Sequence, residues 1–289
     1  MPKTVAVALG TFDGLHKAHK AVLECALNQS TDEKICVTFP YPPKMEVGKK
    51  ELLLTQSQKE KMLYSMGFDK VINLDFKKVK DLGPQDFLDY LVKTFSATHF
   101  CVGYNYRFGC HAKGDAEFLK NYCSEKGLTA IITDGIKCEG TYISSSSIRK
   151  FLKEGKPEMA AEFLGRNFSF TSKVISGDRR GRTIGVPTIN QELPKGLVEV
   201  LFGVYFSTLK INNKSYKAVT NIGIRPTYKL EKPMAETHII GFEGDLYAKE
   251  VTVELVKYLR NEKQFRSLES LTSALKEDIE QANSLEVEI

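Results

Sequence analysis

The stretch VAVALGTFDGLHKAH, residues 5–19, determines how the first half of the chain is expected to fold. Residues 5–10 are apolar or small and predict a short buried strand. The segment from His19 to Asn28 then predicts a helix, so the residues between form a turn from strand to helix. Such a turn presents free backbone N–H groups and the positive end of the helix dipole, an arrangement that suits phosphates.

Two histidines lie at this turn. His16 and His19 are three positions apart, so we expect them to share one face within the first turn of the helix. Imidazoles placed there can donate hydrogen bonds to a triphosphate and to its transition state. Gly10 and Gly14 let the backbone approach the ligand. A lone HxxH pattern is weak, but behind Gly-x-Phe-Asp-Gly, between a strand and a helix, it indicates a nucleotide site.

Strands and helices continue to alternate through the first half. Further strands are predicted at 35–39, 70–74, 99–103 and 128–133, and further helices at 55–66, 84–95, 115–126 and 146–153. This alternation predicts an α/β domain with a doubly wound parallel sheet. Ligands of such sheets bind beyond the carboxyl ends of the strands, so the loops after Gly10, Phe39 and Gly103 are the expected binding loops.

The second half has a different pattern. After a helix-like segment at 157–165, β-branched and aromatic runs occur at 172–176, 201–211, 215–222, 236–242 and 250–256, and a helix is predicted at 268–282. Asn212-Asn213 separates two of these runs, as a hairpin turn would. Many short strands predict a small antiparallel barrel, here followed by a C-terminal helix. The pattern changes near residue 166, which predicts two domains, 1–166 and 167–289.

Composition narrows the possible functions. A chain of 289 residues favours two domains, and its net charge of +5 is compatible with anionic ligands without indicating a nucleic-acid partner. No apolar run reaches the ~18–20 residues of a membrane span, so no membrane partner is expected. The six cysteines form no CxxC pair and indicate reduced thiols, which predicts a cytoplasmic protein. The sequence does not indicate an oligomeric state.

A second glycine-rich segment, GDRRGRTIGVPTIN, covers residues 177–190. The chain has no GxxxxGK[ST] motif, so phosphoryl transfer would have to use other groups. A loop with Gly177, Arg182 and Gly185 offers backbone N–H groups and positive charge to phosphates.

Two neutral oxygen donors follow this loop. Thr188 and Asn190 are two positions apart and point to the same side of an extended chain. Together with nucleotide phosphates and water they can surround Mg²⁺, which favours oxygen ligands. Ile189 would then face the other way, and we expect it in the barrel core.

Taken in chain order, these segments resemble the bacterial bifunctional riboflavin kinase/FMN adenylyltransferase (FAD synthetase) family. The matching segments are GTFDGLHKAH (10–19), TFPYPP (38–43), LLLTQSQKEKMLYSMGFD (52–69), VGYNYRFGCHAKGD (102–115), ISSSSIRKFLKEG (143–155) and the PTIN of 187–190. The resemblance implies a Rossmann-like nucleotidylyltransferase domain and a riboflavin kinase barrel. It implies ATP-dependent phosphorylation of riboflavin to FMN, then adenylylation of FMN to FAD with release of pyrophosphate. Riboflavin, FMN, FAD and ATP are the implied partners, with Mg²⁺ as cofactor.

The resemblance also implies roles for residues of the first domain. Ser144, Ser145 and Arg149 match positions that hold the outgoing phosphates. Phe12 and Asp13 belong to the motif before the histidines, and Asn105 lies in a loop on the side of the flavin and nucleotide.

Two later segments extend the resemblance to the second domain. NIGIRPT (221–227) would border the flavin and nucleotide through Asn221 and Arg225. AETHIIGFEGDLYAKEVTVELVKYLRNEKQF (235–265) contains Glu236, the position of the general base in that family. A carboxylate suits that role, because the 5′-hydroxyl of riboflavin is a poor nucleophile until a base accepts its proton.

The chain departs from the family pattern at five positions, which are Ala18, Tyr41, Asn105, Ile189 and Ala248. Ala18 replaces the glycine of HxGH and adds a methyl group near the expected nucleotide. Asn105 replaces an aspartate and keeps an acceptor but loses the charge, which disfavours a metal ligand there.

Other functions remain open at this level. One is a monofunctional FMN adenylyltransferase with a non-catalytic flavin-binding domain, which the intact PTxN motif and Glu236 disfavour. Another is a flavin-binding regulatory protein, which has no use for the histidine pair or the base. A basic RNA-binding module is the least favoured, because no stripe of aromatic and basic residues is visible.

Overall fold

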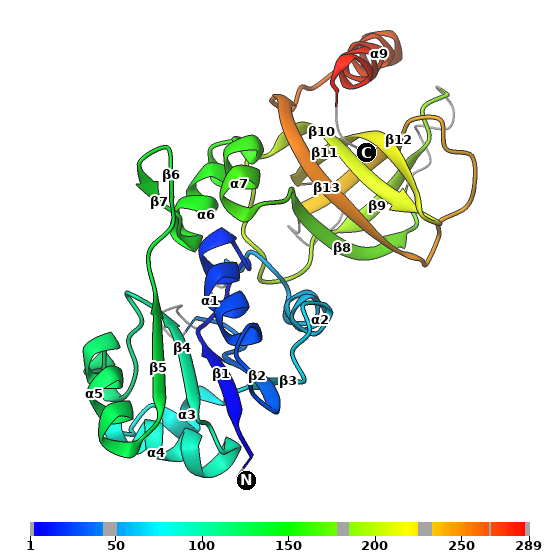
Figure 1. Cartoon of the computed structure of the whole chain (residues 1–289). Helices are drawn as coiled ribbons and strands as arrows, with labels where there is room; N and C mark the ends of the chain where they lie inside the picture. Colours follow the sequence, from blue (N-terminus) through cyan, green and yellow to red (C-terminus); the bar gives the residue numbers. More distant parts are fainter. Residues whose placement is uncertain (1–2, 43–50, 178–184, 225–232, 266, 287–289) are drawn as a thin grey trace. The chain divides into compact units, whose positions relative to one another are not determined.

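The computed structural model describes residues 3–42, 51–177, 185–224, 233–265 and 267–286 (Figure 1). The chain divides into two compact units, Met1–Ser145 and Ser146–Ile289. The helices α6 (Ser145–Lys153) and α7 (Pro157–Leu164) therefore lie almost entirely in the second unit. This division falls before the predicted boundary at 166, which stays a prediction for where one function ends and the other begins.

The first unit is built on a five-stranded sheet with the order β3-β2-β1-β4-β5, in which every pair is parallel. The strands are β1 (Val5–Leu9), β2 (Glu33–Thr38), β3 (Lys70–Asn73), β4 (His99–Gly103) and β5 (Thr129–Thr133). The chain moves outward in one direction from β1 to β3 and in the other from β4 to β5. The strand order therefore reverses between β1 and β4, and ligands of such sheets bind at that point.

Alternate residues of the strands face two separate cores. Val7 and Val37 pack in a core with Leu91 of α4, whereas Ala8 and Cys36 pack in the core that holds α1 and α2 residues. The helices are α1 (Lys17–Leu27), α2 (Gln56–Ser65), α3 (Phe76–Val79), α4 (Pro84–Phe95) and α5 (Ala116–Lys126). Helices thus cover both faces of the sheet, which confirms the predicted doubly wound fold (Figure 1).

The second unit is a closed barrel with the strand order β10-β11-β12-β9-β8-β13, and its pairs are antiparallel. The strands are β8 (Phe168–Ile175), β9 (Thr188–Glu192), β10 (Gly203–Ile211), β11 (Lys214–Ile224), β12 (Pro233–Ile239) and β13 (Glu250–Arg260). The helix α9 (Leu268–Ser284) follows the last strand. The predicted barrel with a C-terminal helix is confirmed.

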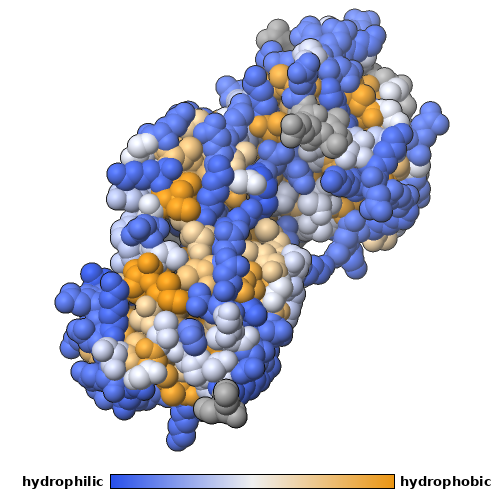
Figure 2. Space-filling view, viewed as in Figure 1, coloured by the Kyte–Doolittle hydropathy of each residue, from blue (hydrophilic) through white to orange (hydrophobic). Residues whose placement is uncertain are grey.

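The helix α9 covers part of the outer face of this barrel. Val204, Phe206 and Val219 form a buried cluster with Ala282 of the helix. At the edge of this contact Arg260 of β13 donates to both carboxylate oxygens of Asp278, at 2.8 and 2.6 Å. Two parallel charge-assisted bonds fix the helix in one position on the strands. In Figure 2 hydrophilic residues cover most of the visible face of each unit, with smaller hydrophobic areas between them.

The structure contains elements that were not predicted from the sequence: the strand β9, the helix α3, the 3₁₀ helix η1 (Cys110–Ala112) and the hairpin of β6 (Lys137–Cys138) and β7 (Thr141–Tyr142). All are short. The strand β9 is largely polar, so its sequence lacks the alternation that marks a strand. It is extended because it pairs with β12 and β8.

Two turns depend on left-handed backbone. Asn212 and Asn213 have φ values of 51° and 62°, as a type I′ hairpin turn requires, and this confirms the turn predicted there. Ala248 has φ 60°, a conformation that disfavours any residue with a Cβ atom. The glycine that the family pattern has at this position would avoid that strain.

We predict that Ala248→Gly stabilises the second unit by about 0.5–1 kcal/mol. Relief of left-handed strain, about 1–2 kcal/mol, exceeds the extra unfolded-state entropy of glycine, about 0.4–1 kcal/mol. Urea denaturation of the full chain measures the change. The matched control, Ala161→Gly within α7, should instead cost about 1 kcal/mol. Equal destabilisation by both substitutions would contradict the prediction.

Two candidate active sites

The structure brings the two predicted histidines into direct contact at the carboxyl end of β1. His16 is the N-cap of α1, and its Nδ1 accepts a hydrogen bond from the backbone N–H of His19 at 3.2 Å. The two rings stack with their centroids 3.5 Å apart. His16 therefore precedes the helix, where the sequence placed it within the first turn. Because its Nδ1 acts as an acceptor, a proton on the neutral ring is at Nε2.

The environment of His19 favours the neutral imidazole. Burial is the largest cause of a pKa well below the usual 6.5, followed by the charges of His16 and Lys59. Phe12 packs edge-on against the same ring at 5.4 Å. The Nδ1 atom of His19 is buried and has no hydrogen-bond partner among the described residues. At neutral pH this ring is therefore uncharged, and a neutral imidazole can still donate one hydrogen bond.

The loop before the histidines is shaped by contacts to its own neighbours. A Cβ atom on Gly10 would lie 2.8 Å from the ring of Phe12, so only glycine fits there. Phe12 and Asp13 are 1% and 3% exposed, and Asp13 accepts a hydrogen bond from the backbone of Leu53 at 2.9 Å. Gly14 has φ 86°. These side chains point inward, which leaves the loop backbone as the surface for a ligand; their predicted binding role stays a prediction.

The remaining predicted residues of the first site lie in two places. Ser145 begins α6 and donates to the backbone oxygen of Asp13 at 2.8 Å, so it is brought to the histidine loop. Ser144 immediately precedes it, and Arg149 lies one turn further along α6 with Nη2 3.4 Å from Ser146 Oγ. Asn105 is exposed in the loop after β4. Phosphate binding by these residues stays a prediction.

The structure places Lys59, for which the sequence predicts no role, beside this loop. Its ammonium is buried and donates to Thr11 O, Thr38 Oγ1 and Phe39 O. A signal was present in the sequence, since Lys59 lies four positions before Leu63, on the buried side of the helix.

In the second unit a row of side chains on one face of the barrel brings together the predicted kinase residues. Glu236 of β12 lies directly opposite Asn221 of β11 on one side and Asn190 of β9 on the other. Directly opposite residues share a face, with Cβ atoms about 4.5–5.5 Å apart. Thr188 lies opposite His238, two positions further along the same two strands, and so shares this face. The strand register therefore assembles residues that lie up to 48 positions apart in the sequence.

The glycine loop is only partly described. A Cβ atom on Gly177 would overlap the side-chain amide of Asn190, so this glycine allows close packing at the predicted metal side. Gly185 has φ 75°, a turn conformation that glycine adopts without strain. Arg182 and Arg225 lie outside the described residues.

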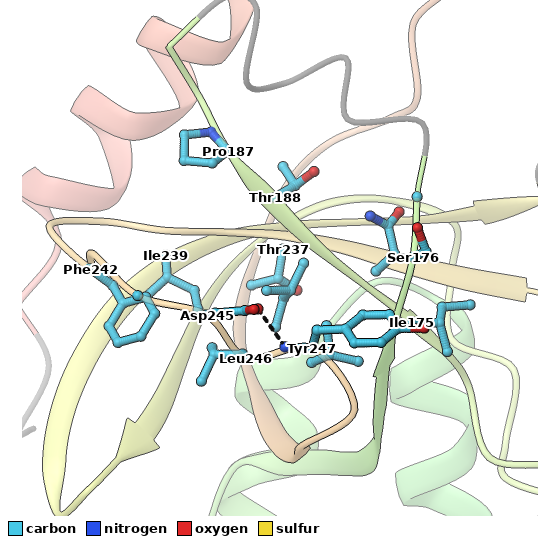
Figure 3. Close-up of a pocket in the computed structure, with 15 residues that line it drawn as sticks. Ile175, Ser176, Pro187, Thr188, Thr237, Ile239, Phe242, Asp245, Leu246 and Tyr247 are labelled. Carbon is cyan, nitrogen blue, oxygen red and sulfur yellow. Dashed lines mark hydrogen bonds between the residues drawn. The ribbon is translucent and has the colours of Figure 1, made fainter.

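A pocket of about 410 Å³ lies between the end of β8, the start of β9 and the segment after β12 (Figure 3). It is lined by the end of β8, by Thr188 to Asn190 of β9, and by the loop of Asp245, Leu246 and Tyr247. Asp245 accepts a hydrogen bond from the backbone of Tyr247 at 2.9 Å, which holds this loop in a turn. The volume falls within the usual range for small-molecule sites.

Thr188 and Asn190 fit a loosely held magnesium ion. Both carry neutral oxygens on the same face of β9, and both line the pocket. The described residues contain no group of three His, Cys, Asp or Glu side chains that could hold a metal ion. Mg²⁺ often retains waters and binds substrate phosphates, so a site with few protein ligands suits it. Ile189 faces Thr237 on the opposite, inward side, as expected, but it is half-buried and also lines the pocket.

Glu262 and His238 are further residues for which the sequence predicts no role. Glu262 Oε1 accepts a hydrogen bond from Asn221 Nδ2 at 3.3 Å, and its carboxylate occupies the space that a Cβ atom on Gly223 would need. His238 Nδ1 lies 2.8 Å from Pro187 O, at the start of β9. Both residues fall inside the quoted 235–265 segment, but only the fold shows what they contact.

Two family models match the chain. The FAD synthetase model matches residues 1–147 and the riboflavin kinase model residues 164–285. The chain belongs to the bifunctional riboflavin kinase/FMN adenylyltransferase family. The first match contains the histidine pair and the second contains the row around Glu236. Residues 148–163, which include Arg149 and all of α7 except Leu164, lie between the two matches.

Individual relatives match nearly the whole chain. The bifunctional riboflavin kinase/FMN adenylyltransferase of Pseudomonas fluorescens is 32% identical over 285 residues, covering 96% of this chain and 91% of the relative. That of Bacillus subtilis is 29% identical, covering 96% and 90%. A crystal structure from Streptococcus pneumoniae, described as a macrolide-efflux protein, is 29% identical with a TM-score of 0.89. The match covers 99% of this chain and 96% of that chain.

Within the described residues of this chain, no helix is both long and apolar enough to cross a membrane.

The lowered pKa of His19 predicts a stability that depends on pH. Below about pH 6.5 the unfolded imidazole takes up a proton that the folded one does not, so the free energy of unfolding falls as the pH falls. The slope from this group is at most about 1.4 kcal/mol per pH unit, until the pH reaches the folded pKa. Urea denaturation at several values between pH 5 and 8 measures it. His19→Gln should have a smaller slope; equal slopes would show that His19 does not titrate differently on folding.

Proposed function

We propose that this chain phosphorylates riboflavin to FMN with ATP in its second unit and adenylylates FMN to FAD in its first. The two family models support one activity for each unit. Riboflavin, FMN, FAD and ATP are its substrates and products. We assign the adenylyltransferase function to residues 1–166 and the kinase function to 167–289. We also propose a cytoplasmic location, where the six cysteines, none of which forms a disulfide in the structure, would stay reduced.

The stacked histidine pair is the observation that supports adenylyl transfer. An oxygen of the FMN phosphate attacks the α-phosphorus of ATP, a new P–O bond forms, and the bond to the β-phosphate breaks to release pyrophosphate. His16 through Nε2–H, and His19 as a neutral imidazole, donate hydrogen bonds to the phosphate oxygens as charge develops. The free N–H groups at the start of α1 add to this. Ser144, Ser145 and Arg149 hold the departing pyrophosphate.

The position of Glu236 between Asn221 and Asn190 is the observation that supports phosphoryl transfer. The Glu236 carboxylate accepts the proton of the riboflavin 5′-hydroxyl as that oxygen bonds to the γ-phosphorus of ATP and ADP leaves. The phosphates are expected over the loop of Gly177, Arg182 and Gly185. Asn221 and Arg225 would border the flavin.

Thr188 and Asn190 would hold Mg²⁺ together with ATP oxygens and water. When bound, the ion supplies positive charge that offsets the charge of the transferring phosphoryl group. The 5′-hydroxyl itself is oriented by residues of this chain, and Glu236 accepts its proton.

We predict that His19→Ala lowers the kcat of FMN adenylylation by roughly 10²–10³-fold, because one donor to the transition state is lost. Riboflavin phosphorylation should be unchanged, so FMN should accumulate. Chromatographic separation of FMN from FAD after incubation with riboflavin, ATP and Mg²⁺ measures both steps. His99→Gln, at the amino end of β4, is the matched control and should leave both steps intact. Normal FAD output from His19→Ala would refute the assignment.

We predict that Glu236→Gln lowers riboflavin phosphorylation by roughly 10²–10⁴-fold, because glutamine keeps the shape but cannot accept the proton. The variant should still make FAD from supplied FMN, since a phosphate nucleophile is already anionic. Glu250→Gln, an exposed change on β13, is the control. Normal phosphorylation by Glu236→Gln would exclude it as the base. If the wild-type chain makes FAD only from FMN, the second unit is a flavin-binding domain without kinase activity.

A further inference from the structure

Lys59 of α2 is a buried lysine to which neither proposed reaction assigns a role. Only 4% of the residue is exposed. Its ammonium donates to Phe39 O at 2.6 Å, to Thr11 O at 3.2 Å and to Thr38 Oγ1 at 3.3 Å. Burial of an ammonium costs several kcal/mol unless it is well paired. Because burying the Lys59 ammonium is costly, its three hydrogen bonds indicate a structural role in the fold or in the site.

The three acceptors lie at the carboxyl ends of two neighbouring strands of the sheet. Thr11 lies in the loop after β1, directly before Phe12. Thr38 is the last residue of β2 and Phe39 follows it. The Thr38 hydroxyl also donates to Thr11 O at 3.0 Å. The ammonium thus joins α2 to the ends of the two strands that meet beside the histidine loop.

The number of N–H donors on the ammonium limits how many further groups Lys59 can bind. A lysine has three N–H donors, and three oxygens already accept from it. Contact with a phosphate would require one of these hydrogen bonds to break. Lys59 is therefore suited to hold the loops rather than to bind the substrate itself.

The charge of Lys59 also reaches the histidine pair. It is one of the causes that lower the pKa of His19. Burial lowers the pKa of Lys59 itself to about 8, so the group remains charged at neutral pH. The titratable groups that act on it are Asp13, Cys36 and Glu60, and each favours its charged form.

We propose that Lys59 is a positioning residue of the adenylyl-transfer site, which fixes the β1 loop against the end of β2 and thereby sets the geometry of the histidine pair. The link to the pair runs through Thr11 to Phe12, whose ring packs edge-on against His19. This inference rests on the proposed function of the histidines.

The test compares Lys59→Met with Lys61→Met in the full-length chain. Lys61 is exposed on the same helix, so its substitution removes the same charge without touching the loops. Lys59→Met should lower the kcat of FMN adenylylation about 10²-fold, the effect of a displaced reacting group. The KM values for ATP and FMN should change little, and riboflavin phosphorylation by the same sample should be normal. A kcat equal to that of Lys61→Met would overturn the proposal.

Two further measurements separate positioning from a loss of folding. Proton NMR of the imidazoles should show a higher pKa for His19 in Lys59→Met than in Lys61→Met, because a nearby positive charge is gone; an unchanged His19 pKa would overturn the electrostatic part. If Lys59→Met does not fold, Thr38→Val removes one acceptor while keeping the shape. It should lower the same kcat, and wild-type activity in that variant would also overturn the proposal.

His19→Ala distinguishes this inference from the function on which it rests. If His19→Ala abolishes adenylylation and Lys59→Met does not impair it, only the role of Lys59 is wrong. If His19→Ala leaves adenylylation intact, the proposed function of the histidines is wrong, and the role of Lys59 in that site falls with it.

Discussion

Backbone polar groups at the ends of buried strands must find hydrogen-bond partners, and both candidate sites depend on this constraint. The strands β1 and β2 end at Leu9 and Thr38, so Thr11 and Phe39 lie beyond the paired strand residues. Side chains supply the missing partners: Lys59 and Thr38 for backbone oxygens, and Asp13 for the backbone N–H of Leu53. An unpaired buried group would cost about as much as a lost hydrogen bond, so these side chains are strongly constrained. The residues that shape the first site are therefore also those that complete its fold.

The second unit meets the same requirement by closing its sheet. In a closed barrel every strand has two neighbours, so the register of each pair is fixed around the whole circle. A shift of one residue would move Glu236 from the face that carries Asn190 to the opposite face. The same register leaves no room for a side chain at Gly177, and the Glu262 carboxylate excludes one at Gly223. Closure of the barrel thus fixes the position of the Glu236 side chain on β12.

The two sites differ in how they treat charge. In the first site, burial and the neighbouring charges of His16 and Lys59 favour a neutral imidazole of His19 beside the buried Lys59 ammonium. The histidine pair thereby offers hydrogen-bond donors, which suit the phosphate oxygens proposed to bind there. The barrel face instead carries the Glu236 and Glu262 carboxylates beside the Asn221 amide. Carboxylate acceptors suit a substrate whose hydroxyl group donates a proton. The difference in charge between the two sites therefore agrees with the chemistry proposed for each unit.

The sequence by itself determined the classes of both units, most element positions and the residues around which each site forms. Periodicity and turn residues are local properties, so the strand–helix alternation, the Asn212-Asn213 turn and the histidine motif could be predicted from neighbouring residues. Only the tertiary structure decided which distant residues contact each other. The pairing of Glu236 with Asn190, the buried contacts of Lys59 and the hydrogen bond from Asn221 to Glu262 join residues 20 to 48 positions apart. Such contacts depend on strand register and loop closure, which arise only when the whole sheet or barrel has formed and which no local pattern specifies.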